Sequence, residues 1–117
     1  MDMESALAAL SALSQSTRLD IFRLLVRHEP DGLPAGDVAR HLDIPQNTIS
    51  THLAILSRAG LLTSRRHSRL IIYRASLARL RALMVFLVRD CCASSPELCA
   101  PLLANLVSCC PATESCP

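Results

Sequence analysis

The stretch Pro45-Gln-Asn-Thr-Ile-Ser-Thr-His-Leu-Ala-Ile-Leu-Ser-Arg-Ala-Gly60 decides the fold that we expect for this chain of 117 residues. Ile49, Leu53 and Leu56 recur at i, i+4 and i+7, so they share one face of a helix and can pack into a core. Gly60 suits the left-handed position at which many helices end. The stretch therefore predicts an amphipathic helix with an apolar back and a polar front.

The polar front of this helix is nearly uncharged and lies mainly in its first turns. Its side chains offer donors and acceptors of the kind that read base edges in the major groove. The candidate base-reading residues are Gln46, Asn47, Thr48, Ser50, Thr51 and His52. Upstream, residues 36–42 predict a short helix that a tight turn joins to the longer one. The pair predicts a helix-turn-helix DNA-binding unit, and the competing interpretation is an ordinary helical hairpin in a small all-α domain.

The residues after Gly60 favour the DNA-binding interpretation, because the pattern changes from helical to strand-like. Residues 61–74 predict two strands joined by a polar tip, which is a β-hairpin wing. From Arg58 to Arg74 the chain has five arginines and no acidic residue. Charge of one sign beside a candidate recognition helix fits contact with DNA phosphates. The candidate phosphate-binding residues are Arg65, Arg66 and Arg69.

Three further helices are predicted around this unit. Apolar stripes indicate a first helix over residues 2–13, a second that begins at the N-cap candidate Ser16, and a long last helix that begins at Ser76. The side chains of the second helix that we expect in the core are Leu19, Ile21, Phe22, Leu25 and Val26. The apolar stripe of the last helix is wider than a small wing domain can cover, so it predicts either a subunit interface or a plain intramolecular core.

Residues 16–25, residues 49–62 and the wing with Arg65-Arg66 and residues 72–74 together resemble the arsenic-repressor (ArsR/SmtB) family. The resemblance covers roughly residues 6–90 and implies a mainly α fold with a small β-hairpin wing, a winged helix-turn-helix that represses transcription. It also implies a homodimer through the first and last helices, which binds double-stranded operator DNA. Two recognition helices about 34 Å apart would read an inverted repeat. Pro45 and Thr51 depart from the Ser and His common in the family, which bears on the operator sequence.

Composition and termini narrow the class of protein. Twelve basic residues against ten acids give a net charge of only +2, and three aromatic residues disfavour stacking on single-stranded bases. The acidic start lacks the basic region and long apolar core of a signal peptide, so we expect a cytoplasmic protein without a membrane span. There is no Cys-x-x-Cys, no βαβ pattern and no His beside a Cys, so we expect no enzyme.

All six cysteines lie in the last 27 residues, as the trios Cys91-Cys92-x6-Cys99 and Cys109-Cys110-x5-Cys116. A cytoplasmic chain keeps its thiols reduced, so binding of a thiophilic ion is the leading chemistry. In one continuous helix, Cys92 and Cys99 would be about 10 Å apart along the axis, so the helix must stop between them. Residues 93–96 suit that stop because they end in proline.

Three thiolates fit the pyramidal coordination of trivalent arsenic, whereas structural zinc prefers four ligands. Cys91, Cys92 and Cys99 are also similar to family members with cysteines at the end of the last helix. We therefore expect arsenite as inducer, with antimonite as a second one. The alternatives are methylarsenite, cadmium or lead, redox sensing, and, from another class, a cysteine-rich metal-carrying protein. The expected domains are residues 1–92, which bind DNA and dimerise, and residues 93–117, a cysteine-rich tail in which the second trio is expected to be accessory or disordered.

Overall fold

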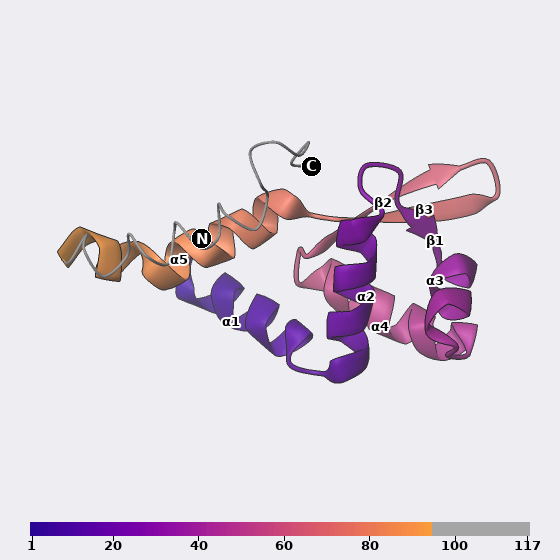
Figure 1. Cartoon of the computed structure of the whole chain (residues 1–117), viewed down its shortest axis with the longest axis horizontal. Helices are drawn as coiled ribbons and strands as arrows, with labels where there is room; N and C mark the ends of the chain where they lie inside the picture. Colours follow the sequence, from indigo (N-terminus) through magenta and orange to yellow (C-terminus); the bar gives the residue numbers. More distant parts are fainter. Residues whose placement is uncertain (95–117) are drawn as a thin grey trace, which may run out of the picture. The chain divides into compact units, whose positions relative to one another are not determined.

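The computed structural model describes residues 1–94, with the side chains of residues 1–89. Within this range lie α1 (Met3–Leu13), α2 (Ser16–Arg27), β1 (Leu33–Pro34), α3 (Ala35–Leu42), α4 (Gln46–Arg58), β2 (Leu62–His67), β3 (Leu70–Ala75) and α5 (Leu77–Ser94) (Figure 1). The strands form one antiparallel sheet in the order β1-β3-β2. The predicted mainly α fold with a wing is confirmed, and β1 is an addition to it.

The chain divides into two compact units, Met1–Leu83 and Met84–Pro117. The first unit contains everything from α1 to β3 together with the start of α5, and the described part of the second is the remainder of α5. The predicted domain boundary after residue 92 remains a prediction. Among the described residues, no helix combines the length and the apolar character that a membrane crossing requires.

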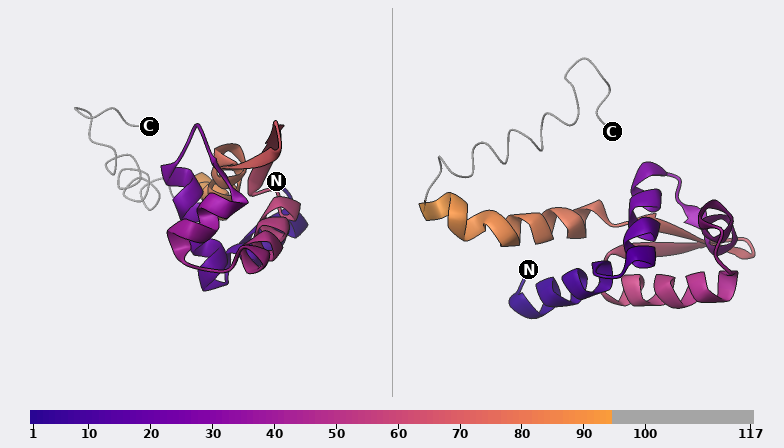
Figure 2. Two further views of the ribbon diagram at one scale, coloured as in Figure 1. Left: turned by 90° about the vertical axis from the view of Figure 1, so that its right-hand side faces the viewer. Right: turned by 60° about the horizontal axis from the view of Figure 1, so that its bottom comes forward.

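The back of α4 lies at the centre of the core of the first unit. Ile49, Leu53 and Leu56 are fully buried, as their spacing predicts. Helix α2 packs against both α4 and the sheet (Figure 2), and its buried residues are Ile21, Phe22, Leu24 and Leu25. The prediction that Leu19 lies in the core is wrong, since this residue is 40% exposed. Leu19 lies about 200° around the helix from Ile21, whereas Leu24 lies one turn away on the same face.

The C-terminus of α4 is a Schellman motif centred on Gly60. The N–H of Gly60 donates to the Ser57 carbonyl at 3.0 Å, and that of Leu61 donates to the Leu56 carbonyl at 3.0 Å. Gly60 has φ +81°, the left-handed conformation that this motif needs. Leu56 and Leu61 are both fully buried, and the Leu61 carbonyl accepts a hydrogen bond from the Ser76 N–H at 2.8 Å. The predicted end of the helix is therefore confirmed.

The helix N-termini are capped by side chains in three places. Ser76 Oγ accepts from the Arg79 N–H at 3.2 Å at the start of α5, as predicted. Asp2 Oδ1 accepts from the Ser5 N–H at 2.8 Å, and hydrogen bonding by the Ser5 side chain, together with this backbone bond, lowers the pKa of Asp2. The predicted cap of α2 is wrong by one residue, because Gln15 has the extended backbone of an N-cap and its side chain accepts from the Arg18 N–H at 2.9 Å.

Replacement of Leu53 by alanine should lower the free energy of unfolding by about 2–5 kcal/mol, because it leaves a cavity in the fully buried back of α4. The matched control is Leu19→Ala, which truncates a 40% exposed leucine and should cost less than about 1 kcal/mol. Urea unfolding followed by circular dichroism measures both. Equal losses would contradict the assignment of α4 to the centre of the core.

Candidate DNA-binding surface

Helices α3 and α4 form a helix-turn-helix with a three-residue connection. Helix α3 ends at Leu42, the following C-cap residue Asp43 takes the left-handed conformation with φ 55°, and the Ile44 N–H donates to the Ala39 carbonyl at 3.1 Å. Pro45 stands at the N-cap of α4 without a side-chain cap, and its carbonyl accepts from the Ile49 N–H at 3.0 Å. The turn is therefore set by backbone geometry and not by a capping side chain.

Four of the predicted base-reading side chains lie on the exposed front of α4, away from its buried back. They are Asn47, Thr48, Ser50 and Thr51. Thr51 Oγ1 donates to the Asn47 carbonyl at 3.2 Å, and Asn47 Oδ1 accepts from the Thr48 N–H at 2.9 Å. The front is thus a row of short hydrogen-bonding groups in the first turns of the helix, the part that enters the major groove in helix-turn-helix proteins.

The other two predicted residues, Gln46 and His52, lie on the two flanks of α4. Gln46 extends over α3, where its Oε1 would be 3.5 Å from a Cβ added to Gly36. His52 is half-buried, and its Nδ1 lies 3.5 Å from Nη1 of Arg18 at the start of α2. The sequence pattern did not separate these flanking positions from the front, because both kinds of residue are polar.

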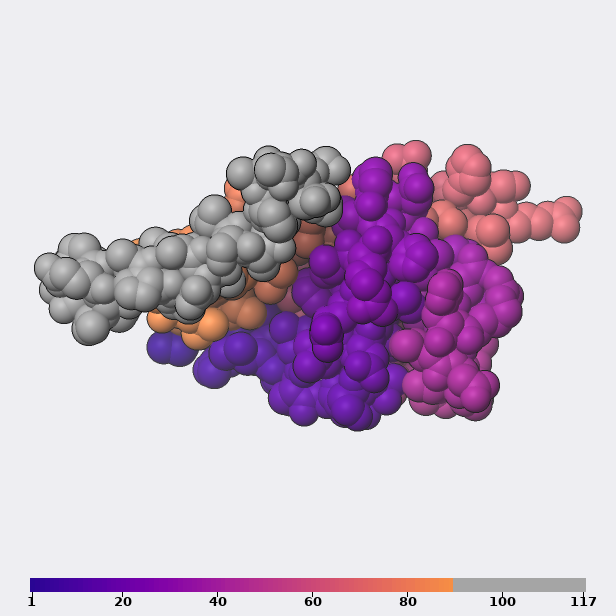
Figure 3. All heavy atoms as spheres, in the orientation of Figure 1, coloured from indigo at the N-terminus to yellow at the C-terminus, as the bar shows by residue number. Residues whose placement is uncertain are grey.

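The wing is a hairpin in which β2 pairs with β3 from Leu62 opposite Ala75 to His67 opposite Leu70. Ser68 and Arg69 form a two-residue turn, and Ser68 takes the left-handed conformation with φ 62°. The hairpin tip projects beyond the helices of the same unit (Figure 3). The three predicted phosphate-binding arginines, Arg65, Arg66 and Arg69, are all exposed in it.

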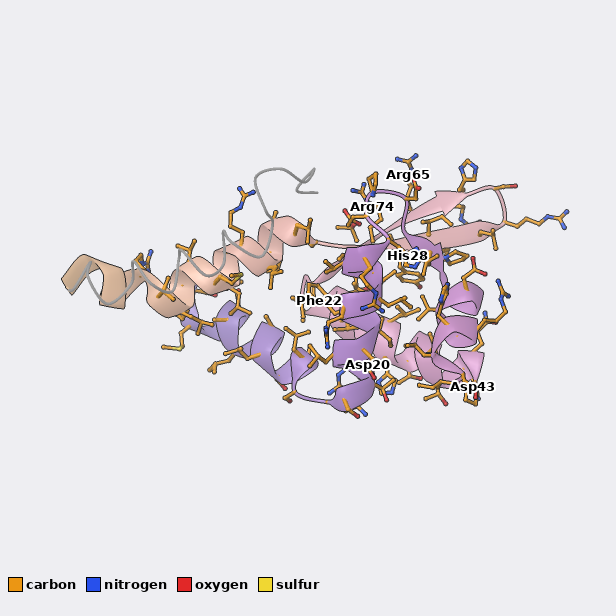
Figure 4. All side chains as sticks on the ribbon, viewed as in Figure 1. Asp20, Phe22, His28, Asp43, Arg65 and Arg74 are labelled. Atoms are coloured by element: carbon orange, nitrogen blue, oxygen red, sulfur yellow. The ribbon has the colours of Figure 1, made fainter. Side chains whose placement is uncertain are left out.

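Arg65 and Arg66 point to opposite faces of the wing, because successive side chains of a strand alternate. Arg66 shares its face with Leu62 and Ala75, whose side chains are buried toward the helices. Arg65 and Arg74 are on the outer face, where they line an open hollow of about 390 Å³ (Figure 4). A wing inserted into a DNA groove would therefore present positive charge to both of its walls.

Arg74 is less available to DNA than the sequence suggests. Its Nη2 and Nε donate to the two carboxylate oxygens of Glu29 at 2.8 and 3.2 Å, and these bonds raise the pKa of Arg74. Glu29 lies 45 residues away in the chain, so the run of arginines without acids in the sequence did not reveal it. In the described part of the chain, the ion pairs join Arg74 to Glu29 and Arg40 to Asp37 and leave the wing-tip arginines unpaired.

The predicted arsenic site lies outside the described side chains. Cys91 and Cys92 belong to the backbone of α5, whereas Cys99 and the second trio follow the last described residue. Of the expected helix stop, residues 93 and 94 continue α5, whereas residues 95 and 96 lie outside the described residues. Among the described residues, no three His, Cys, Asp or Glu side chains come together as ligands of a metal ion.

Residues 13–65 match a family described as a helix-turn-helix domain. Over 87 residues the chain is 31% identical to the transcriptional activator HlyU of Vibrio cholerae. The aligned region covers 74% of this chain and 78% of HlyU. A solved structure of reduced HlyU superposes with a TM-score of 0.59 at 29% identity, covering 76% of this chain and 90% of that one.

Two further solved structures are similar over most of their length. An ArsR-like transcriptional regulator from Rhodococcus sp. RHA1 has a TM-score of 0.69 at 28% identity, covering 97% of this chain and 96% of that chain. A protein described as a possible transcriptional regulator for arsenical resistance has a TM-score of 0.57 at 31% identity, covering 68% of this chain and 83% of that chain. The matched proteins are transcriptional regulators, in agreement with the α3–α4 unit and the wing.

Replacement of Arg65 or Arg66 by alanine should weaken binding to any DNA sequence and reduce the slope of log affinity against log salt by about 1 each. The matched control is Arg74→Met, which removes a charge already paired with Glu29 and should leave the slope nearly unchanged. Fluorescence anisotropy of a labelled duplex at several salt concentrations measures the slopes. If the Arg65 and Arg66 variants both kept the wild-type slope, the wing would not be part of the DNA interface.

Proposed function

We propose that this chain, which belongs to the ArsR/SmtB family of winged helix-turn-helix transcriptional regulators, is a homodimeric repressor that trivalent arsenic releases from its operator. The family consists of DNA-binding regulators and not of enzymes. The proposal of trivalent arsenic as inducer is based on the Cys91-Cys92-x6-Cys99 trio, which begins in the last helix of the fold.

Operator binding is supported by the division of chemistry on the first unit. The front of α4 supplies short hydrogen-bonding side chains, and the wing supplies unpaired positive charge. Base edges are read by hydrogen bonds, whereas phosphates are held by cations, so the two groups have complementary tasks on one duplex. Base contacts by the exposed front of α4, and phosphate contacts by Arg65, Arg66 and Arg69, are part of this proposal.

The homodimer is supported by apolar side chains that α1 and α5 expose in the single chain. On α1, Met3 is 62% and Leu7 57% exposed, one turn apart on the same face, and on α5, Leu87 is 55% exposed. Apolar groups of this size on two helices are typical of an interaction surface. A second copy of the chain would cover them and would supply the second recognition helix that an inverted repeat requires.

Arsenite is proposed as inducer because the three thiolates of Cys91, Cys92 and Cys99 match its coordination, and antimonite shares that chemistry. The similarity to a possible regulator of arsenical resistance supports it. An ion held at the end of α5 lowers operator affinity if it binds more tightly to the DNA-free form. A coupling of about 1–3 kcal/mol per site would weaken binding about 5- to 150-fold.

A redox-responsive regulator is the second candidate. HlyU, a transcriptional activator that is 31% identical to this chain, has a solved structure described as its reduced form. In this chain, oxidation of two of the six thiols to a disulfide would take the place of ion binding. Methylarsenite, cadmium and lead remain candidate ligands of the same thiols, and a metal-carrying protein would bind them without binding DNA.

One titration separates these functions. Reduced protein is bound to a labelled duplex from upstream of its gene, and anisotropy is followed with arsenite, antimonite, methylarsenite, cadmium, lead and peroxide added in parallel. Release by arsenite under anaerobic conditions supports the proposal. Release by peroxide alone favours the redox candidate, release by cadmium or lead alone replaces the ion, and absence of binding to any duplex favours the metal carrier.

Cys91→Ser, Cys92→Ser and Cys99→Ser should each retain DNA binding and lose release by arsenite, because two thiolates hold the ion less tightly than three. The matched control is Cys109→Ser, which removes a thiol from the second trio and should respond like the wild type. The measurement is the arsenite concentration that releases half of the duplex. If the control lost its response while the first three variants kept theirs, the ion would belong to the second trio.

Replacement of Leu7 by glutamate should dissociate the dimer, because it places a charge in the proposed α1 interface. Leu70→Glu serves as the control, since Leu70 is equally exposed, at 53% against 57%, but lies on the wing. Sedimentation velocity should show monomers for the first variant and dimers for the second. A dimeric Leu7→Glu protein with wild-type dissociation would move the interface away from α1.

A further inference from the structure

Arg18 joins three helices at one point. It lies in the first turn of α2, and its Nε–H donates to the carbonyl of Ala12 near the end of α1 at 2.7 Å. Its backbone N–H donates to Gln15 Oε1 at 2.9 Å. With the guanidinium fixed in this way, Nη1 lies 3.5 Å from Nδ1 of His52 on α4. Arg18 is half-buried, as is His52, so the contact is partly shielded from water.

The hydrogen bond between Arg18 and His52 can run in only one direction. A guanidinium carries five N–H donors and no acceptor, so Arg18 can only donate. Nδ1 of His52 must then accept with its lone pair, and the proton of the neutral ring must sit on Nε2. A protonated His52 would turn an N–H toward the Arg18 guanidinium and would place two cations side by side. The contact therefore favours one tautomer of the neutral imidazole.

We propose that Arg18 is a positioning residue that holds His52 as an Nε2–H donor toward DNA. This inference rests on the proposed operator binding. The two ring nitrogens point in widely different directions, so Nε2 is directed away from Arg18 when Nδ1 faces it. The partner of such a donor is a hydrogen-bond acceptor of the duplex, either N7 of a purine in the major groove or a phosphate oxygen.

The tautomer is tested in the free protein, without DNA. Long-range proton–nitrogen correlation spectra at about pH 8, where imidazoles are mostly neutral, distinguish a protonated Nε2 from a protonated Nδ1. Wild-type His52 should show an unprotonated Nδ1 and a protonated Nε2, assigned by the loss of its signals in His52→Gln. The other three histidines of the chain are internal references.

A matched pair of variants separates positioning from stability. Arg18→Met removes the guanidinium from His52, whereas Gln15→Ala loosens the same helix junction by removing the α2 cap and leaves the guanidinium in place. Only Arg18→Met should move the His52 nitrogen signals toward a mixture of tautomers. Unchanged signals in Arg18→Met, or equal changes in both variants, would overturn the positioning role.

The donor is then tested on the duplex. The amide nitrogen of Gln reaches the position of histidine Nε2, whereas that of Asn reaches only the position of Nδ1. His52→Gln should therefore keep wild-type affinity, and His52→Asn should lose about 2- to 10-fold. Equal losses in the two variants would overturn the donor role.

Duplexes with 7-deazaguanine or 7-deazaadenine at single positions, which lack N7, identify the acceptor. If one substitution weakens the wild type and His52→Gln but not His52→Asn, the acceptor is a base edge. If no base substitution has this effect, but a single methylphosphonate weakens the wild type and His52→Gln and not His52→Asn, the acceptor is a phosphate. If neither a 7-deazapurine nor a methylphosphonate discriminates, the proposed contact with purine N7 or phosphate is overturned. Failure of the wild type to bind any duplex would overturn the proposed function, and the spectra of the free protein would still decide the role of Arg18.

Discussion

The left-handed turn at Gly60 is the constraint on which the arrangement of the first unit depends. Gly60 has φ +81°, a conformation that residues with a side chain rarely adopt, whereas a Cβ there would meet only the flexible end of the Arg79 side chain at 2.6–2.9 Å. The turn returns Leu61 to the core, and the Leu61 carbonyl holds the Ser76 N–H. The end of α4, the base of the wing and the start of α5 are thereby fixed to one another by a few backbone atoms.

This arrangement separates the two kinds of chemistry that DNA recognition requires. The apolar back of α4 is buried in full, which leaves its front free to carry short polar groups that contribute little to folding. The unpaired arginines lie on the exposed wing, so folding does not have to bury their charge. Residues on the front of the helix can therefore differ without loss of the fold, whereas Ile49, Leu53 and Leu56 cannot.

Local periodicity was enough to predict α4, its end at Gly60 and the β-hairpin, because each of these depends on residues that are neighbours in sequence. The features that it missed depend on distant partners. The two-residue strand β1 exists through its pairing with Tyr73 and Ile72, and Glu29 reaches Arg74 across 45 residues. Gln15 rather than Ser16 caps α2 because of backbone conformation, which composition does not reveal. The thiol trio was inferred from its spacing and from the family resemblance, and Cys99 lies beyond the described residues.

The pairing of the wing also limits how this surface can change in evolution. Both β1 and β2 pair with β3 at Ile72 and Tyr73, whereas from Ile71 to the turn β3 pairs with β2 alone. Insertions of two residues at the turn would lengthen the wing and keep every side chain on its face. An insertion of one residue within β2 would exchange the faces of the side chains between it and the turn. Lineages that adopt new operators should therefore vary this hairpin in steps of two residues.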